Sequence, residues 1–118
     1  MPLQNIIPSD YATQLAEKVA LFVQAFTPLG ITEPEIARSE ALHYRLRAEF
    51  HVTHENKRVD YAMFGAANPK LPVAIEDFPV AVESICAIMP RLREYLQASN
   101  TLKDGLFQVD FLATLSGE

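Results

Sequence analysis

Residues 44–54, with the sequence YRLRAEFHVTH, alternate between apolar and polar side chains and decide the fold of this chain. The apolar side chains fall on one face of the expected strand: Tyr44, Leu46, Ala48, Phe50 and Val52. The polar side chains fall on the other face: Arg45, Arg47, Glu49, His51 and Thr53. A period of two is typical of a β-strand with one buried face. We therefore predict a strand that packs its apolar face on a core and turns its arginines outward.

Turn and strand signals on both sides of this stretch predict an antiparallel sheet. Glu55-Asn56-Lys57 is typical of a turn, and RVDYAMFGA at 58–66 of a second strand, so the pair forms a β-hairpin. The loop from Ala66 to Pro72 contains the turn signal Asn68-Pro69. PVAI at 72–75 indicates a short strand, and LFQVDFLATLSGE at 106–118 a last one. Consecutive strands joined by short turns favour antiparallel pairing.

Two further segments have the apolar period of amphipathic helices. The first is residues 9–27, with Ser9 as N-cap, and the second is residues 79–98, with Pro79 in its first turn. Their apolar faces consist of Leu15, Val19, Phe22 and Phe26, and of Val82, Ile85, Met89, Leu92 and Leu96. Pro90 is expected to kink or break the second helix because it lacks a backbone N–H. The predicted fold is α+β, an antiparallel β-sheet with two amphipathic helices covering one face.

Length and composition indicate a single domain over residues 1–118. Apolar residues make up 49% and charged residues 21% of the chain, as in globular proteins. The net charge of −5 excludes a wholly basic nucleic-acid-binding protein but not a local basic face. No apolar stretch approaches the ~20 residues that span a bilayer, and the N-terminus lacks a secretory signal. We therefore expect a cytoplasmic protein that does not contact membranes.

Positive charge gathers around the first predicted strand. Residues 38–58 hold five basic and three acidic side chains, whereas the rest of the chain holds 5 basic and 12 acidic ones. A strand that presents Arg45, Arg47 and His51 on one face suits contact with phosphates, which arginine binds through two hydrogen bonds, and with bases, on which arginine stacks. The alternative is a solvated face on which Arg45 or Arg47 pairs with Glu49 or Asp60. The residues alone favour this alternative, because most charged strand faces are only solvated.

The remaining candidates for chemistry favour structural roles. His43, His51 and His54 lack metal-ligand spacing, so we expect no metal. Cys86 lies on or beside the buried helix face and is expected to be a small buried hydrophobe. We find no catalytic residues and no glycine-rich loop, and therefore expect no cofactor in this chain. Phe107 opens the last strand, where its ring would either stack on a base or, as the residues alone favour, pack in the core.

Four segments together resemble the N-terminal part of the bacterial tRNA (uracil-5-)-methyltransferases. They are YATQLAEKVA at 11–20, HYRLRAEFHVTH at 43–54, IEDFPVAVESICAIMPRL at 75–92 and GLFQVDFLATLSG at 105–117. The resemblance implies an RNA-contacting domain of an enzyme that uses S-adenosylmethionine to make 5-methyluridine in the T-loop of tRNA. The family's cofactor-binding fold and catalytic cysteine lie in a C-terminal part that has no match here, so this chain alone is expected to be inactive.

The resemblance also implies which residues meet the T-arm of tRNA. They are Arg45, Arg47, His51, Phe107 and Gln108, with Phe107 stacking inside the T-loop. His51 departs from the family, whose members often carry an arginine there, and a histidine is mostly neutral at pH 7. Which of Arg45 and Arg47 contacts RNA is left open.

The strand-like C-terminus allows two interpretations that composition does not separate. The strand pairs inside this domain, or the chain has been cut from a longer one. The resemblance favours a cut. The alternative function is a non-enzymatic interaction module that forms a homodimer by pairing an exposed edge strand with a second copy.

Overall fold

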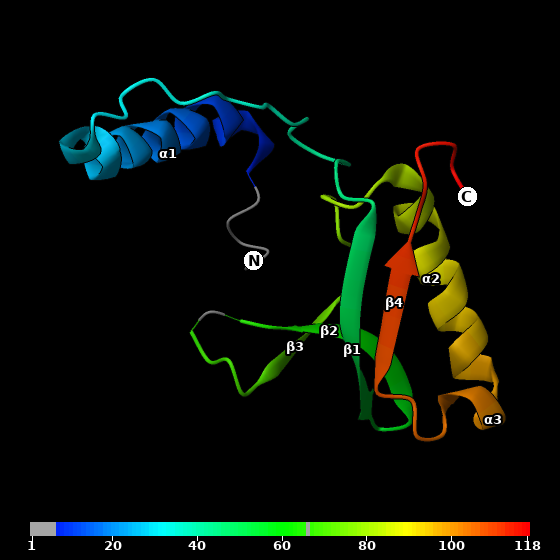
Figure 1. The fold of residues 1–118 in the computed structure, drawn as a ribbon. Coiled ribbons are helices and arrows are strands. Elements are labelled where there is room, and N and C mark those ends of the chain that lie inside the picture. The colour runs from blue at the N-terminus through cyan, green and yellow to red at the C-terminus, as the bar shows by residue number, and fades with distance from the viewer. Residues whose placement is uncertain (1–6, 66) are drawn as a thin grey trace.

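The computed structural model describes residues 7–65 and 67–118, and its centre is a four-stranded antiparallel sheet (Figure 1). The strands are β1 (Arg47–Glu55), β2 (Arg58–Phe64), β3 (Pro72–Ile75) and β4 (Gln108–Leu112). Their order is β3-β2-β1-β4, so that β1 lies inside the sheet and β4 forms one edge. The α+β class and the antiparallel sheet are thus confirmed.

The β1–β2 hairpin follows the alternation in the sequence. Ala48, Phe50 and Val52 of β1 are buried, and the residues between them are exposed. Asn56 and Lys57 form a two-residue turn with positive φ angles of 52° and 64°. Two successive positive φ angles belong to the turn type that matches the twist of a hairpin. The turn is therefore where it was expected, while β2 ends at Phe64 and Ala66 lies outside the described residues.

Replacing Lys57 with glycine is expected to raise the free energy of unfolding by about 0.5–1 kcal/mol. Lys57 holds a φ of 64°, where a Cβ crowds the backbone and glycine does not. Urea unfolding followed by circular dichroism measures the change. Lys70→Gly is the control, because φ at Lys70 is not positive, and it should bring no gain. A Lys57→Gly variant less stable than the wild type would contradict the turn assignment.

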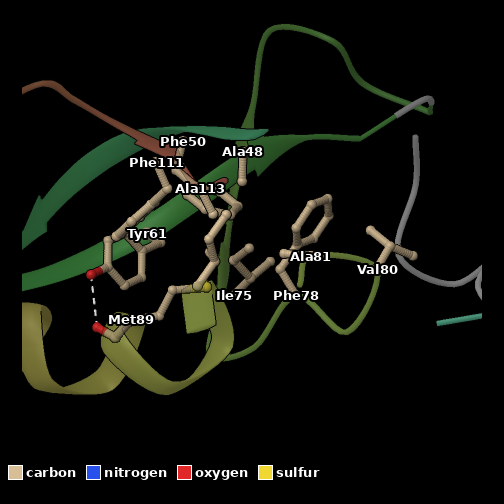
Figure 2. Close-up of a cluster of buried hydrophobic side chains, with 11 residues drawn as sticks. Ala48, Phe50, Tyr61, Ile75, Phe78, Val80, Ala81, Met89, Phe111 and Ala113 are labelled. Carbon is tan, nitrogen blue, oxygen red and sulfur yellow. Dashed lines mark hydrogen bonds between the residues drawn. The ribbon is translucent and has the colours of Figure 1, made fainter. Parts of the chain in front are cut away.

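The core lies between the sheet and α2 (Glu83–Ala98), which covers one face of it (Figure 1). Phe50 of β1 is 1% exposed and lies at the centre of a group of aromatic rings. Its ring centroid is 5.3 Å from that of Phe78, 5.5 Å from Tyr61 and 6.0 Å from Phe111. The Tyr61 hydroxyl donates a hydrogen bond of 2.7 Å to the Met89 carbonyl (Figure 2). This bond joins β2 to α2 across the core.

The helix predicted at 79–98 is α2, with a later start. It begins at Glu83 and not at Pro79, because the backbone of residues 79–82 instead pairs with residues 43–45. Pro79, expected in the first turn, therefore lies before the helix. Pro90 is inside α2 without ending it, so no break occurs there.

The helix predicted at 9–27 forms but does not cover the sheet. A 3-10 turn at Pro8–Asp10 leads into α1 (Tyr11–Phe26), and Ser9 lies in that turn rather than at the N-cap. None of the α1 residues is buried, and the helix lies apart from the sheet (Figure 1). The prediction of two covering helices is wrong in this respect. Periodicity reveals an apolar face but not the surface against which that face packs.

The last strand is shorter than predicted. The connection after α2 contains a short helix, α3 (Asn100–Lys103), and β4 ends at Leu112. Beyond it, Ala113 N–H still donates to the Leu46 carbonyl at 2.8 Å. Among the described residues, no helix is long and apolar enough to cross a membrane.

Candidate RNA interface

The face of the sheet opposite α2, called the outer sheet face below, carries the polar side chains of β1. The register places His51 of β1 opposite Gln108 of β4, and Arg47 opposite Leu112. On its other side, His51 lies opposite Ala62 of β2. Arg47 and His51 thus share the outward face that their spacing predicts. Gln108 joins them from a strand that is distant in the sequence.

The arginines of the outer sheet face are paired with acidic neighbours on their own strands. Arg47 forms an ion pair with Glu49, and Arg58 pairs with Asp60 at 3.0 Å. The expected pairing of Arg47 with Glu49 is therefore present, whereas Asp60 pairs with a different arginine. An exposed pair contributes no more than about 1 kcal/mol. The Arg47 side chain is 68% exposed, so another anion can reach it and replace Glu49 as its partner.

An aromatic contact lies beside these charges. The His51 ring meets the Phe64 ring edge to face, with 4.5 Å between centroids. Both residues are exposed, and Gln108 Nε2 nearby on the same face donates to Asp110 Oδ1 at 2.8 Å. Sequence reasoning missed Phe64, because its partner lies across the hairpin rather than along the strand.

Arg45 lies apart from this group. It precedes β1 and forms an isolated parallel bridge with Ala81. Its guanidinium carbon is 5.9 Å from the centroid of the Phe78 ring, a buried core residue. The prediction that strand alternation extends through Arg45 is wrong, because the chain pairs there with the segment before α2. Contact between Arg45 and RNA stays a prediction.

Phe107 is exposed, although it shares the strand alternation of a buried residue. It is 71% exposed, whereas Phe111, four residues on, is 8% exposed. The core-packing interpretation of Phe107 is therefore wrong. Two contacts hold the backbone of residues 106 and 107: Val52 N–H donates to the Phe107 carbonyl at 2.9 Å, and His54 Nε2 lies 2.5 Å from the Leu106 carbonyl. The ring is thus presented to solvent on a fixed backbone.

A cleft lies beside Phe107, between the β1–β2 turn and the connection from α3 to β4. We call it the hairpin-end cleft, and its lining includes His54, Lys57, Lys103 and Phe107. Sequence reasoning missed both lysines. They lie 46 positions apart, and no local pattern links them.

Comparison with known proteins shows the family. A family model described as tRNA (Uracil-5-)-methyltransferase matches residues 10–118. The chain belongs to this family. The matched residues include β1, β4 and every residue of the outer sheet face and the hairpin-end cleft named above.

Relatives that align with the whole chain include two tRNA/tmRNA (uracil-C(5))-methyltransferases. The tRNA/tmRNA (uracil-C(5))-methyltransferase of Aromatoleum aromaticum is 62% identical over 118 residues, which are 100% of this chain and 32% of the relative. That of Dechloromonas aromatica is 55% identical over 118 residues, or 33% of the relative. The chain thus spans about a third of the length of these methyltransferases.

Cys86 is placed for a structural role in this chain. Its thiol donates to the carbonyls of Phe78 at 3.3 Å and Ala81 at 3.4 Å. Burial, and then the carboxylates of Asp77 and Glu83, raise the pKa of the Cys86 thiol. A raised pKa keeps the thiol protonated and therefore a poor nucleophile. The prediction of a small buried hydrophobe thus holds in part, because Cys86 is only partly buried.

The histidines are not gathered around one point. His43 Nδ1 is 2.8 Å from the Ala81 carbonyl, His51 lies on the outer sheet face and His54 contacts Leu106. Across residues 7–65 and 67–118, no group of three His, Cys, Asp or Glu side chains is placed to hold a metal ion.

Proposed function

We propose that this chain is the N-terminal, tRNA-binding portion of a longer, S-adenosylmethionine-dependent methyltransferase that forms 5-methyluridine in the T-loop of tRNA. The observation that carries the proposal is the alignment of all 118 residues with tRNA/tmRNA (uracil-C(5))-methyltransferases. The exposed Phe107 ring supports it, because aromatic side chains that stack on unpaired bases are a common means of RNA recognition. We place the protein in the cytoplasm, together with its tRNA partner.

The described residues do not fit S-adenosylmethionine. Glycine-rich loops that hold nucleotide cofactors follow a strand and open a helix. Gly65 lies between two strands, Gly105 between α3 and β4, and the connection from β3 to α2 has no glycine. We therefore assign no methyl-transfer step to this chain, and propose that the cofactor site and the catalytic cysteine lie in the two-thirds of the relatives that it does not span.

Recognition is proposed to use Arg47, His51, Phe107 and Gln108, with Arg45 further away. Arg47 would exchange its exposed Glu49 partner for a phosphate, and Gln108 offers an amide to the RNA. Phe107 would stack on a base. The net charge of −5 opposes RNA binding at long range, so we expect affinity to depend on these local contacts.

Titration of a fluorescein-labelled T-arm hairpin RNA with this chain tests the proposal by anisotropy. We expect saturable binding that weakens as salt rises, because phosphate contacts release counterions. Phe107→Ala should weaken binding about tenfold, since one base–aromatic stack contributes about 1–3 kcal/mol. Phe22→Ala is the matched control, because it removes an exposed ring from α1. If Arg47→Ala, His51→Ala and Phe107→Ala all bind like the wild type, the site assignment is wrong.

The edge position of β4 supports a second candidate, a module that forms a homodimer through this strand. β4 pairs with β1 on one side only within the described sheet, and Leu112 on it is 78% exposed. Size-exclusion chromatography with light scattering distinguishes a dimer from a monomer. A monomer at high protein concentration would contradict this candidate without affecting the first.

A further inference from the structure

A groove lies where the β1–β2 turn and the start of β2 meet the side of α2. We call it the α2 groove, and its lining includes Lys57, Val59, Arg93, Glu94 and Gln97. Gln97 Oε1 accepts from Val59 N–H at 2.7 Å, and Gln97 Nε2 donates to the Lys57 carbonyl at 2.7 Å. Both bonds join residues of the groove itself, so its two walls are fixed against each other, as in most preformed ligand sites.

Arg93 of α2 brings an unpaired buried nitrogen to this groove. Within the part of the chain that the structure describes, its Nη1 is the buried side-chain nitrogen or oxygen that has no hydrogen-bond partner. Its guanidinium carbon lies 5.8 Å from the centroid of the Tyr61 ring, which attracts the cation but offers no anionic acceptor. An unpaired donor on a charged group is costly, and most buried donors are paired. The guanidinium therefore favours an anionic partner.

An anion can reach Arg93 through the groove. Arg93 as a whole is partly exposed and lines the groove, although its Nη1 is covered. The positive charge of a guanidinium is delocalised over the whole planar group, so an anion at the accessible part of the side chain compensates it.

The charged side chains that line the groove are mainly basic. Lys57, Arg58 and Arg93 face one acidic residue, Glu94, which gives a net charge of +2 where the whole chain carries −5. Arg58 is already paired with Asp60 at 3.0 Å. Among the described residues the ion pairs within 4 Å involve Arg47 and Arg58, so Lys57 and Arg93 have no such partner. These two cations are the ones that a ligand would meet.

We propose that the α2 groove binds a phosphate group, with Arg93 and Lys57 as its two cations. The planar fork of a guanidinium matches the oxygens of a phosphate, and the ammonium of a lysine adds a point charge. The phosphate belongs either to an RNA backbone or to a free phosphorylated molecule. This site goes beyond the proposed function, because none of the residues proposed to contact the T-loop lines the groove.

Thermal unfolding in inorganic phosphate, against sodium chloride of equal ionic strength, tests the site. A ligand that binds only the folded state raises the Tm. We expect phosphate to raise the Tm of the wild type by about 3 °C more than that of Arg93→Gln. Arg91→Gln is the matched control and should shift like the wild type, because Arg91 is exposed on the same helix and does not line the groove. General stabilisation by excluded phosphate acts on every variant and cancels in this comparison.

Two further variants predict shifts of opposite sign. Glu94→Gln removes the negative charge from the groove, so its phosphate-induced rise in Tm should exceed that of the wild type. Lys57→Gly removes a cation, so its rise should be smaller. Because Lys57→Gly is expected to be more stable than the wild type, a smaller rise would not reflect a damaged fold. Equal rises for the wild type, Arg93→Gln and Lys57→Gly would overturn the site.

Titration of the labelled T-arm hairpin RNA distinguishes the two sources of phosphate. If the RNA backbone occupies the groove, Arg93→Gln should lower the slope of log K against log salt by about 0.7–0.9, the value for one phosphate contact. If a free phosphorylated molecule occupies it, the slope stays unchanged while the difference in Tm remains. Failure of the wild-type chain to bind the RNA would overturn the proposed function but not this site.

Discussion

Phe50→Ala is expected to lower the free energy of unfolding by about 3–5 kcal/mol. Phe50 is 1% exposed, and its ring meets those of Tyr61, Phe78 and Phe111. Truncation removes the apolar contacts with all three rings and leaves a cavity. This cavity cannot close easily, because β1 is held between two neighbouring strands. A domain of this size has a total stability of only about 5–15 kcal/mol. The variant should therefore unfold at much lower urea concentration or temperature.

Phe22→Ala provides the matched control for Phe50→Ala. Phe22 is 39% exposed on α1 and stacks on Phe26 at 4.4 Å between centroids. Because it lies outside the core of the sheet, we expect a loss below about 1 kcal/mol. Equal losses for the two variants, measured by urea unfolding, would contradict a core centred on Phe50.

Tyr61→Phe should lower the free energy of unfolding by about 1–2 kcal/mol at neutral pH. At alkaline pH, the stability of this variant should fall less steeply than that of the wild type. The variant removes the hydrogen bond to the Met89 carbonyl, which is 2.7 Å long and buried. Burial raises the pKa of the Tyr61 hydroxyl above its ordinary value of 10.0, an effect that Arg93 partly offsets. The folded protein therefore holds this proton more tightly than the unfolded chain.

The sign of the pH dependence follows from that difference. The contribution of Tyr61 is fully present below pH 10, the ordinary value, and is lost as pH rises through the higher pKa of the folded state. Cys86 acts in the same direction from an ordinary value of 9.0. Urea unfolding between pH 8 and about 11 should show a steeper fall for the wild type than for Tyr61→Phe. Tyr95→Phe, at a 66% exposed tyrosine, is the control and should follow the wild type. Parallel curves for wild type and Tyr61→Phe would exclude this role of Tyr61.

The candidate site was predictable where all its residues lie on one strand. The spacing of Arg47 and His51 is enough to place them on one face, and the structure confirms it. Phe64 and Lys103 approach the site from other elements, across a hairpin and a helix–strand connection, and so leave no local pattern. The RNA contacts themselves came from resemblance to the family, and they stay predictions until binding is measured.

The amino-acid sequence by itself determined the hairpin and the amphipathic character of α1 and α2. Strand alternation, turn residues and helical periodicity are local properties, because each depends on neighbours within a few positions. The sequence could not place Arg45, because residues 43–45 pair with the distant residues 79–82 instead of extending the expected strand.

Only the tertiary structure decided which apolar faces are covered. Phe107 and Phe111 share one alternation, yet one is exposed and the other buried. The apolar face of α1 likewise matches a buried helix in sequence, although none of its residues is buried. Burial depends on which distant segments arrive at a surface. In this chain Phe111 belongs to the core between the sheet and α2, whereas Phe107 stays exposed, because packing is a property of the whole fold rather than of a single segment.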